Sequence, residues 1–264
     1  MTQRRFPPAR PACPAGGASL DSRQLRDSRL CRRRRTDELW NRHYGGLSSG
    51  RRLCRLSDPV GSGFVPNLAH PGGNVTGFHN FEPAIGGKWL DLLRQIAPSL
   101  RQVAVLHVPD IVPNVAFLRV AEAAAPAFGI TVTAAEARNA ADIERVLPAF
   151  AQAGGGGLIV TPSALTATQR DLIIALAERL GLPAIYSFRF YAASGGLMSY
   201  GIDQVELVRA AASYVDRILR GTNPGELPVQ LPTKFELVIN VKTAGALGLT
   251  VPNSLQLLAD EVIE

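Results

Sequence analysis

The stretch Gly157-Leu158-Ile159-Val160-Thr161 is a short apolar run that begins with glycine and is rich in β-branched residues. Similar runs lie at 103–107 and 130–133 before it and at 183–187 after it, with starts about 27 residues apart. Short apolar runs bounded by glycine or proline are typical of buried parallel strands. We therefore expect four strands of one sheet between residues 103 and 187.

The segments between these runs have the spacing of amphipathic helices. Between 143 and 150 the apolar residues recur at i, i+3, i+4 and i+7, which places them on one helix face. Comparable stripes occupy 117–128 and 172–180, and Gly181 follows the second as a helix-ending residue. This alternation predicts an α/β fold, in which a parallel sheet carries helices on both faces and right-handed crossovers join the strands.

The flanking sequence adds further elements. A helix is predicted over 89–97, upstream of the first strand. Downstream, a strand-like run at 197–200 is followed by Asp203 and Glu206, which have the spacing of a capping box and open a helical stripe. A last strand is predicted over 235–240, and two short helical pieces follow it.

The charge of the chain is unevenly distributed. The 264 residues carry a formal charge of +6, but residues 1–56 alone hold 14 Arg and four acidic residues, a net charge of +10. From residue 57 onward the net charge is −4, and no cysteine occurs there. Nucleic-acid binding needs positive charge on a folded surface, so we expect no nucleic-acid partner. No apolar span of about 20 residues, as a transmembrane helix requires, is present.

The motifs of common catalytic and metal sites do not occur in the required context. Gly86-Gly87-Lys88 is followed by Trp89 instead of Ser or Thr, so it is not a Walker loop. The pattern G-x-S-x-G at 46–50 does not follow a predicted strand, as a nucleophile elbow must. The histidines lack the i, i+4 pairing of a metal site: His43, His70, His79 and His107. We expect no catalytic residue, no metal and no cofactor.

Polar and aromatic side chains instead follow the predicted strands, where an open α/β sheet places its ligand. Hydrogen-bonding groups beside aromatic rings suit reversible binding of a small molecule. The candidates are Thr76, Phe78, Asp110, Thr161, Ser163, Tyr186 and Arg189, together with their neighbours Asn74, Asn114, Phe188 and Tyr191. Each of these residues, taken singly, also fits an ordinary helix cap or turn. As a set they favour binding over bond-breaking.

Several longer motifs carry a family resemblance. They are Ser57-Asp58-Pro59-Val60-Gly61-Ser62-Gly63-Phe64-Val65, His70-Pro71-Gly72-Gly73-Asn74-Val75-Thr76-Gly77, Ala193-Ser194-Gly195-Gly196-Leu197-Met198-Ser199-Tyr200-Gly201, Leu227-Pro228-Val229-Gln230, Pro232-Thr233-Lys234-Phe235-Glu236-Leu237-Val238-Ile239-Asn240 and Ala259-Asp260-Glu261-Val262-Ile263-Glu264. From residue 57 to the C-terminus the sequence resembles the ABC-transporter substrate-binding protein family. That family has the type I periplasmic-binding fold and includes binders of tryptophan and other aromatic amino acids.

The resemblance implies a two-lobe type I periplasmic-binding-protein-like fold with parallel sheets flanked by helices and an incomplete first lobe. It implies a solute-binding protein without catalysis, which holds a small molecule such as an amino acid between the lobes. The cleft-facing loops of the family fall on Asp58, Thr76, Phe78, Asp110, Thr161, Ser163, Tyr186 and Arg189. The expected partners are the solute and the membrane permease subunits of a transporter, with the chain itself a monomer.

The same resemblance suggests a division of the chain. Residues 57–100 and 201–235 are expected to form a remnant of the first lobe, 101–200 the second lobe, and 236–264 a C-terminal segment of either lobe. Residues 1–56 show neither strand nor helix periodicity and are expected to be disordered. The resemblance implies a periplasmic protein, since members of the family carry a signal peptide for export. Residues 1–56 lack the apolar core of such a peptide, so a location in the cytoplasm is the alternative for the chain as written.

The composition of residues 1–56 has a second interpretation. A segment rich in Arg and Pro and free of Lys is what a GC-rich coding region gives when read out of frame. We hypothesise that this segment is a shifted reading frame or a mis-assigned start, which would leave the first lobe truncated. Sequencing the upstream DNA tests this hypothesis, since it requires another frame that encodes apolar strands and a signal segment.

Two alternatives from other functional classes remain open. An α/β enzyme that acts on a small carboxylate or sugar would require a nucleophile beside a base in the cleft. A cytosolic ligand-sensing domain of a regulator would share the fold and add a pair of DNA-reading helices, which residues 1–56 do not show.

Overall fold

The computed structural model describes residues 52–56, 59–60, 63–154 and 156–264, with residues 52–56 described in their backbone only. The expectations of disorder over 1–56 and of a ligand contact at Asp58 concern residues that lie, apart from 52–56, outside the described part of the chain.

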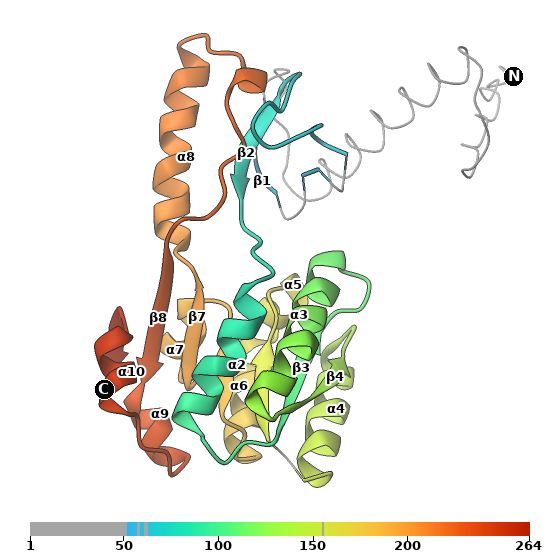
Figure 1. The fold of residues 1–264 in the computed structure, drawn as a ribbon, viewed down its shortest axis with the longest axis vertical. Coiled ribbons are helices and arrows are strands. Elements are labelled where there is room, and N and C mark those ends of the chain that lie inside the picture. The colour runs from blue at the N-terminus through green and yellow to red at the C-terminus, as the bar shows by residue number, and fades with distance from the viewer. Residues whose placement is uncertain (1–51, 57–58, 61–62, 155) are drawn as a thin grey trace, which may run out of the picture. The chain divides into compact units, whose positions relative to one another are not determined.

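A seven-stranded sheet forms the main body (Figure 1). Its strands lie in the order β4-β3-β5-β6-β7-β8-β9, and all neighbours are parallel except β7 and β8. The strands are β3 (Gln102–His107), β4 (Thr131–Glu136), β5 (Gly157–Val160), β6 (Ala184–Tyr186), β7 (Met198–Ile202), β8 (Phe235–Asn240) and β9 (Glu261–Ile263). The predicted α/β architecture with a parallel sheet is therefore confirmed.

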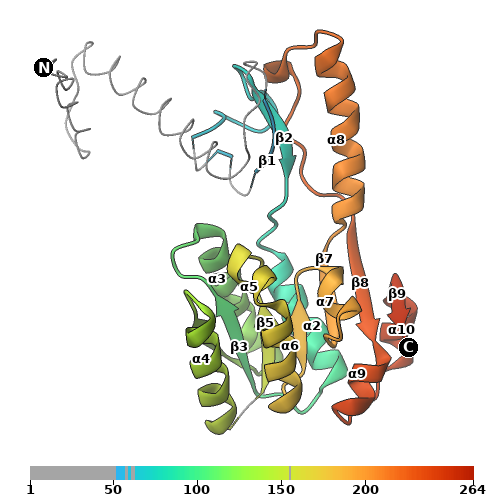
Figure 2. The same ribbon diagram turned by 180° about the vertical axis from the view of Figure 1, so that it is seen from behind.

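Helices cover both faces of this sheet, as Figures 1 and 2 show from opposite sides. On one face lie α2 (Ile85–Ile96) and α3 (Val112–Phe128), and on the other lie α4 (Ala140–Gln152) and α6 (Arg170–Arg179). The remaining helices of the sheet region are α5 (Ala164–Thr168), α7 (Arg189–Ala193), α9 (Val241–Ala246) and α10 (Asn253–Leu258). No helix of the described residues has the length and apolar character that crossing a membrane requires.

Strand alternation divides the buried side chains between two hydrophobic cores. Val103 and Val105 of β3 face the core that contains Trp89 of α2, whereas Ala104 and Leu106 face the core of α4 and α6. Every side chain of β3 from Val103 onward is buried, because a parallel strand with helices on both faces has no solvent side.

Helix α2 shares its core with the seven-stranded sheet. Trp89, Leu90 and Leu93 are buried among residues of α3 and the sheet, and the Trp89 indole N–H donates to the Tyr200 carbonyl oxygen over 2.7 Å. The family resemblance assigns this helix, with the rest of residues 57–100, to the expected first lobe. Strands β8 and β9, from the segment left unassigned, extend the same sheet.

A second, smaller assembly contains the other described strands. Strands β1 (Arg52–Leu56) and β2 (Val75–His79) form a two-stranded parallel sheet, and α8 (Gln204–Leu219) packs against both strands. Buried apolar side chains join α8 to β2 and to the segment that follows the short 3-10 helix η1 (Pro224–Glu226): Phe78, Leu207, Tyr214 and Leu227. Three stretches of chain connect this assembly to the main sheet, and we call them the crossing segments: 80–84, Asp203 and 227–234.

The contact between β6 and β7 depends on a glycine. A Cβ atom added to Gly201 would lie 1.8 Å from the carbonyl oxygen of Ser187. Because that neighbour is backbone, a side chain at this position would force the ends of the two strands apart.

We expect the substitution Gly201→Ala to lower the free energy of unfolding by about 2 kcal/mol, as overpacking in a closely packed site does. Urea denaturation monitored by circular dichroism measures this change. Gly245→Ala is the matched control: it lies in α9 with open space around the added Cβ, and it should be neutral or slightly stabilising. Equal effects of the two substitutions would contradict the assigned contact.

Candidate ligand-binding site

The carboxyl ends of β3, β5 and β6 meet at one edge of the main sheet. Leu106 is paired with Val160, and Val160 is paired with Tyr186, so the loops that follow these three strands start side by side. In open α/β sheets this edge is the usual ligand position. Five of the residues that the family resemblance assigns to the cleft lie at the end of β6 or in the loops and helix starts that follow these strands: Asp110, Thr161, Ser163, Tyr186 and Arg189.

Asn114 joins two of these loops. This buried residue of α3 accepts a hydrogen bond from the Val108 N–H at Oδ1 (3.1 Å) and donates from Nδ2 to the Pro162 carbonyl oxygen (2.8 Å). The loops after β3 and β5 are thus held by one amide. A buried amide whose donor and acceptor are both used fixes the backbone around it.

Asp110 is the most exposed of the predicted residues in these loops. Its carboxylate pairs with Arg138 Nε at 3.1 Å, and 73% of its side-chain surface is accessible. Exposed ion pairs of this kind contribute little stability. The Asp110 carboxylate is therefore available to a ligand that carries a positive charge.

Thr161 and Ser163 direct their hydroxyls to the protein itself. The Thr161 hydroxyl donates to the Leu106 carbonyl oxygen over 2.9 Å, and Thr161 is fully buried. Ser163 caps α5 in a capping box with Thr166, whose own hydroxyl reaches the Thr161 carbonyl oxygen. These two side chains shape the loop after β5 in this structure.

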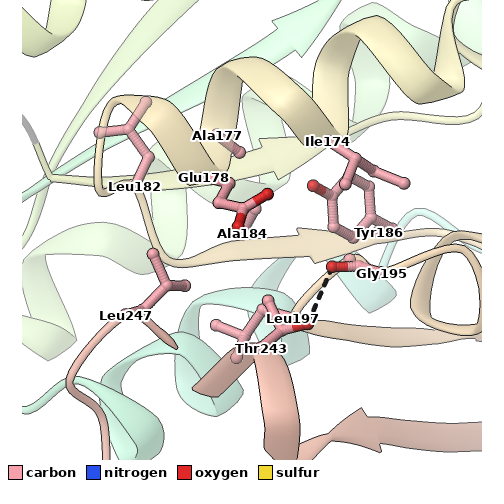
Figure 3. Close-up of a pocket in the computed structure, with 11 residues that line it drawn as sticks. Ile174, Ala177, Glu178, Leu182, Ala184, Tyr186, Gly195, Leu197, Thr243 and Leu247 are labelled. Atoms are coloured by element: carbon pink, nitrogen blue, oxygen red, sulfur yellow. Dashed lines mark hydrogen bonds between the residues drawn. The ribbon is translucent and has the colours of Figure 1, made fainter. Parts of the chain in front are cut away.

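Tyr186 lies in the core beneath the same edge. Its ring stacks on Tyr191 with 4.7 Å between centroids, and it borders a shallow recess formed with α6 and α9 (Figure 3). Burial raises the pKa of the Tyr186 hydroxyl and raises that of Tyr191 to about 12. Both phenols are neutral at physiological pH.

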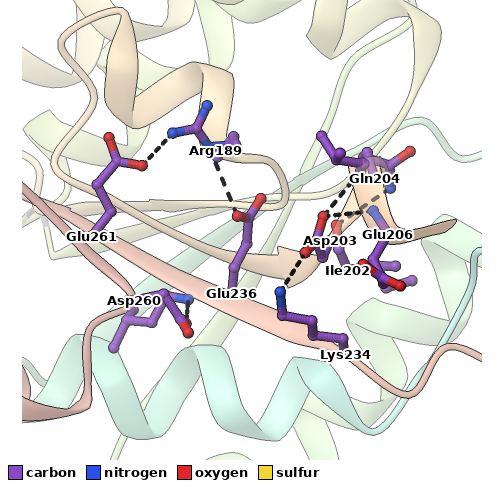
Figure 4. Close-up of polar contacts among 11 residues, drawn as sticks. Arg189, Ile202, Asp203, Gln204, Glu206, Lys234, Glu236, Asp260 and Glu261 are labelled. Carbon is purple, nitrogen blue, oxygen red and sulfur yellow. Dashed lines mark hydrogen bonds and ion pairs between the residues drawn. The ribbon is translucent and has the colours of Figure 1, made fainter. Parts of the chain in front are cut away.

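Arg189 is held by two carboxylates of the last strands. Its guanidinium pairs with Glu261 of β9 and lies 3.7 Å from Glu236 of β8 (Figure 4). Hydrogen bonding to Glu261 raises the pKa of Arg189, while burial raises the pKa of Glu236. Arg189 thus connects the start of α7 to the edge of the sheet.

Thr76 and Phe78 belong to the smaller assembly. The fully buried Thr76 hydroxyl donates to the Leu227 carbonyl oxygen over 2.6 Å. Phe78 packs on Tyr214 with ring centroids 4.9 Å apart. Phe78 also lines an open hollow beside the crossing segments, together with residues of α8 and of 230–234.

A pair of residues that the sequence does not mark as site residues joins two crossing segments. The Asp203 N–H donates to the Lys234 carbonyl oxygen (3.1 Å), and the Asp203 carboxylate lies 2.9 Å from Lys234 Nζ (Figure 4). The same carboxylate accepts from the N–H groups of Val205 and Glu206, so it caps α8 as the sequence predicted. Lys234 lies within a family motif, and that was the only sequence signal for its role.

The described residues contain no cluster of His, Cys, Asp or Glu arranged to hold a metal ion. Besides backbone, the sheet edge offers the accessible carboxylate of Asp110 and buried aromatic rings below it. Such groups can bind and orient a polar small molecule.

This sheet, with one antiparallel pairing between β7 and β8 and with helices on both faces, is that of the type I periplasmic-binding-like proteins. The chain belongs to the ABC transporter substrate binding protein family, whose model matches residues 53–263.

Individual relatives agree with this assignment. A tyrosine-binding protein of Clostridioides difficile is 24% identical over 198 residues, which are 75% of this chain and 56% of that protein. The chain thus spans little more than half the length of this curated relative.

Two solved structures are similar as well. One is an ABC domain from Streptococcus pneumoniae in complex with L-Trp, with 25% identity, a TM-score of 0.73, and coverage of 81% of this chain and 72% of that one. The other is a conserved domain protein from Vibrio cholerae, with 28% identity, a TM-score of 0.71, and coverage of 78% and 69%.

We expect Asp203→Ala to lower the free energy of unfolding by about 1 kcal/mol at pH 7, because the variant loses the cap of α8. Hydrogen bonds from the Glu206 N–H and from Lys234 lower the pKa of Asp203 in the folded protein. Its contribution is therefore present above the unfolded pKa of about 3.9 and lost as the pH falls through the lower folded value.

Urea denaturation at pH 7 and at pH 3 checks this expectation. The difference between the two proteins should be smaller at pH 3. The control is Asp216→Ala, which removes an exposed ion pair from the same helix and should change stability by less than about 0.5 kcal/mol. A difference between the Asp203 variant and the parent chain that is the same at both pH values would rule out the carboxylate as its source.

Proposed function

We propose that this protein binds a small solute for uptake by an ABC transporter and that it does so without catalysis. The match of residues 53–263 to the substrate-binding family carries this proposal. The geometry of the sheet edge supports it, since the loops after β3, β5 and β6 converge there and Asn114 holds two of them.

The proposed ligand is an amino acid or a related compound with a positively charged amino group. The names of two relatives, one that binds tyrosine and one in complex with L-Trp, support this class of ligand. On this chain the accessible carboxylate of Asp110 would pair with the ammonium group. Among the other predicted residues, the Thr161 and Ser163 hydroxyls would act through the backbone that they shape, and Tyr186 from below.

The division into lobes is part of the same proposal. The main sheet with its helices is one lobe, and the assembly of β1, β2 and α8 belongs to the other. The crossing segments, tied by Asp203 and Lys234, would be the hinge about which the lobes close on the solute. Thr76 and Phe78 would be the residues that the small assembly contributes to the ligand site. The proposed partners are the permease subunits of the transporter, which the protein would meet on the side of the membrane that faces away from the cytoplasm.

A thermal-shift screen with aromatic and other amino acids, nucleosides and sugars tests the proposal. We expect at least one amino acid to raise the melting temperature, because a ligand that binds only the folded state stabilises it. If no solute of these classes did so, or if a candidate were turned over, the transport proposal would be wrong.

For a solute that binds, we expect Asp110→Ala to weaken affinity by about tenfold, as the loss of a hydrogen bond to a charged group does. Isothermal titration calorimetry measures the change. Asp91→Ala is the matched control, since it removes an ion-paired carboxylate from α2, outside these loops. Unchanged affinity in the Asp110 variant would remove that residue from the site and leave the binding function standing.

A further inference from the structure

Helix α7 continues the loop after β6 and is fastened to strand β8 near both of its ends. The helix packs against β7 and β8. At its start the Arg189 guanidinium lies 3.7 Å from the carboxylate of Glu236, the second residue of β8. Near its end the Ala192 carbonyl oxygen accepts a hydrogen bond from Nδ2 of Asn240, the last residue of β8, over 3.2 Å. Strand β8 therefore sets the position of α7.

The second carboxylate at Arg189 comes from the last strand. Glu261 of β9 pairs with the Arg189 guanidinium (Figure 4). Strand β9 is held to β8 at its start, where the Asp260 carboxylate accepts from the Leu237 N–H (2.8 Å) and the Asp260 N–H donates to the Leu237 carbonyl oxygen (2.8 Å). Strand β9 thus presents Glu261 at a fixed place, and the start of α7 is bound to two strands of the sheet.

Side-chain bonds also join the loop after β6 to the other loops of the sheet edge. The buried Ser187 hydroxyl, directly after β6, donates to the Val160 carbonyl oxygen of β5 over 2.7 Å. Asn114 in turn holds the loops after β5 and β3 together. The loops after β3, β5 and β6 therefore form one connected unit, and Arg189 attaches this unit to β8 and β9.

The Arg189 guanidinium and the Asp110 carboxylate lie toward opposite ends of the strand order. Asp110 pairs with Arg138, which follows β4, whereas Arg189 pairs with residues of β8 and β9. Neighbouring strands are about 4.8 Å apart, so β3 and β8 are about 19 Å apart across the sheet. The ammonium and carboxylate groups of an amino acid are attached to one carbon atom. An amino acid whose ammonium group pairs with Asp110 therefore cannot place its carboxylate on Arg189.

We propose that Arg189 and Glu261 are positioning residues of the solute site: Glu261 holds Arg189, and Arg189 fixes the loop after β6 in the arrangement that binds the solute. This inference rests on the proposed function. It gives the C-terminal strand a part in binding, although β9 lies outside the edge loops. A solute binds only those molecules whose loop is in the competent arrangement, so loosening the loop lowers the apparent affinity by the same fraction.

Isothermal titration calorimetry with L-tyrosine, or with the amino acid that the thermal-shift screen selects instead, measures the effect on affinity. We expect Glu261→Gln to weaken binding about threefold and Arg189→Gln about fivefold, since the second change also removes the contact with Glu236. Because both changes break the same ion pair, the double variant should be no weaker than Arg189→Gln alone. Parental affinity in both single variants, or losses that multiply in the double variant, would overturn the proposal.

The carboxamide of the same amino acid separates positioning from direct contact. L-tyrosinamide keeps the ammonium group and the ring of L-tyrosine but has no carboxylate. A positioning role requires Arg189→Gln to weaken the binding of both compounds by the same factor. A loss that occurs with the amino acid and vanishes with its amide would show that Arg189 pairs with the solute carboxylate, and the proposal would be wrong. Melting temperatures of the solute-free variants should stay close to that of the parent chain, because exposed ion pairs add little stability.

Hydrogen exchange of the solute-free chain tests the hold on the loop by itself. The Tyr191 N–H donates to the Phe188 carbonyl oxygen across the start of α7, and we expect it to exchange faster in Glu261→Gln. The control Glu122→Gln removes an exposed carboxylate from α3 and should leave this rate and the affinity unchanged. Equal rates in Glu261→Gln and the parent chain would overturn the proposal. A parent chain that binds no amino acid would instead overturn the proposed function, whatever the exchange rates.

Discussion

The Asp203 carboxylate makes the contacts on which the connection between the main sheet and the small assembly depends. It caps α8, pairs with Lys234 and sits where β7 leaves the main sheet. One side chain therefore fixes the direction of a helix and the separation of two crossing segments. An ion pair alone would add little stability at this partly exposed position. The carboxylate also accepts hydrogen bonds from two N–H groups that would otherwise lack partners in the helix.

The architecture of the main sheet could be predicted because it is encoded locally. Strand β5 and the helices around it follow from apolar runs and helical stripes that each lie within a few residues. The place of α2 could not be predicted in this way, since an amphipathic stripe shows that a helix is covered and not by which sheet. The Trp89 indole meets the Tyr200 carbonyl oxygen 111 residues away.

The candidate site was predictable at the level of loops and less so at the level of side chains. The predicted ends of the strands locate the loops that hold Asp110 and Ser163. The register of β3, β5 and β6 brings these loops to one edge of the sheet. The partner of a hydroxyl depends on that register, so the bond from Thr161 to Leu106 could not be derived from spacing. The carboxylates around Arg189 come from β8 and β9, more than 40 residues later, and their pairing with Arg189 depends on the order of the strands in the sheet, which sequence spacing does not reveal.

The double role of Asn114 has a consequence for how binding preferences can change in this fold. Because its amide holds the loops after β3 and β5 together, these loops form one rigid rim whose shape is set from within α3. The accessible side chains on the rim, such as Asp110, contribute little to holding it. Under the proposed function, substitutions there would alter which solute is preferred while the frame that presents these side chains stays the same. The rim would then separate the evolution of specificity from that of stability.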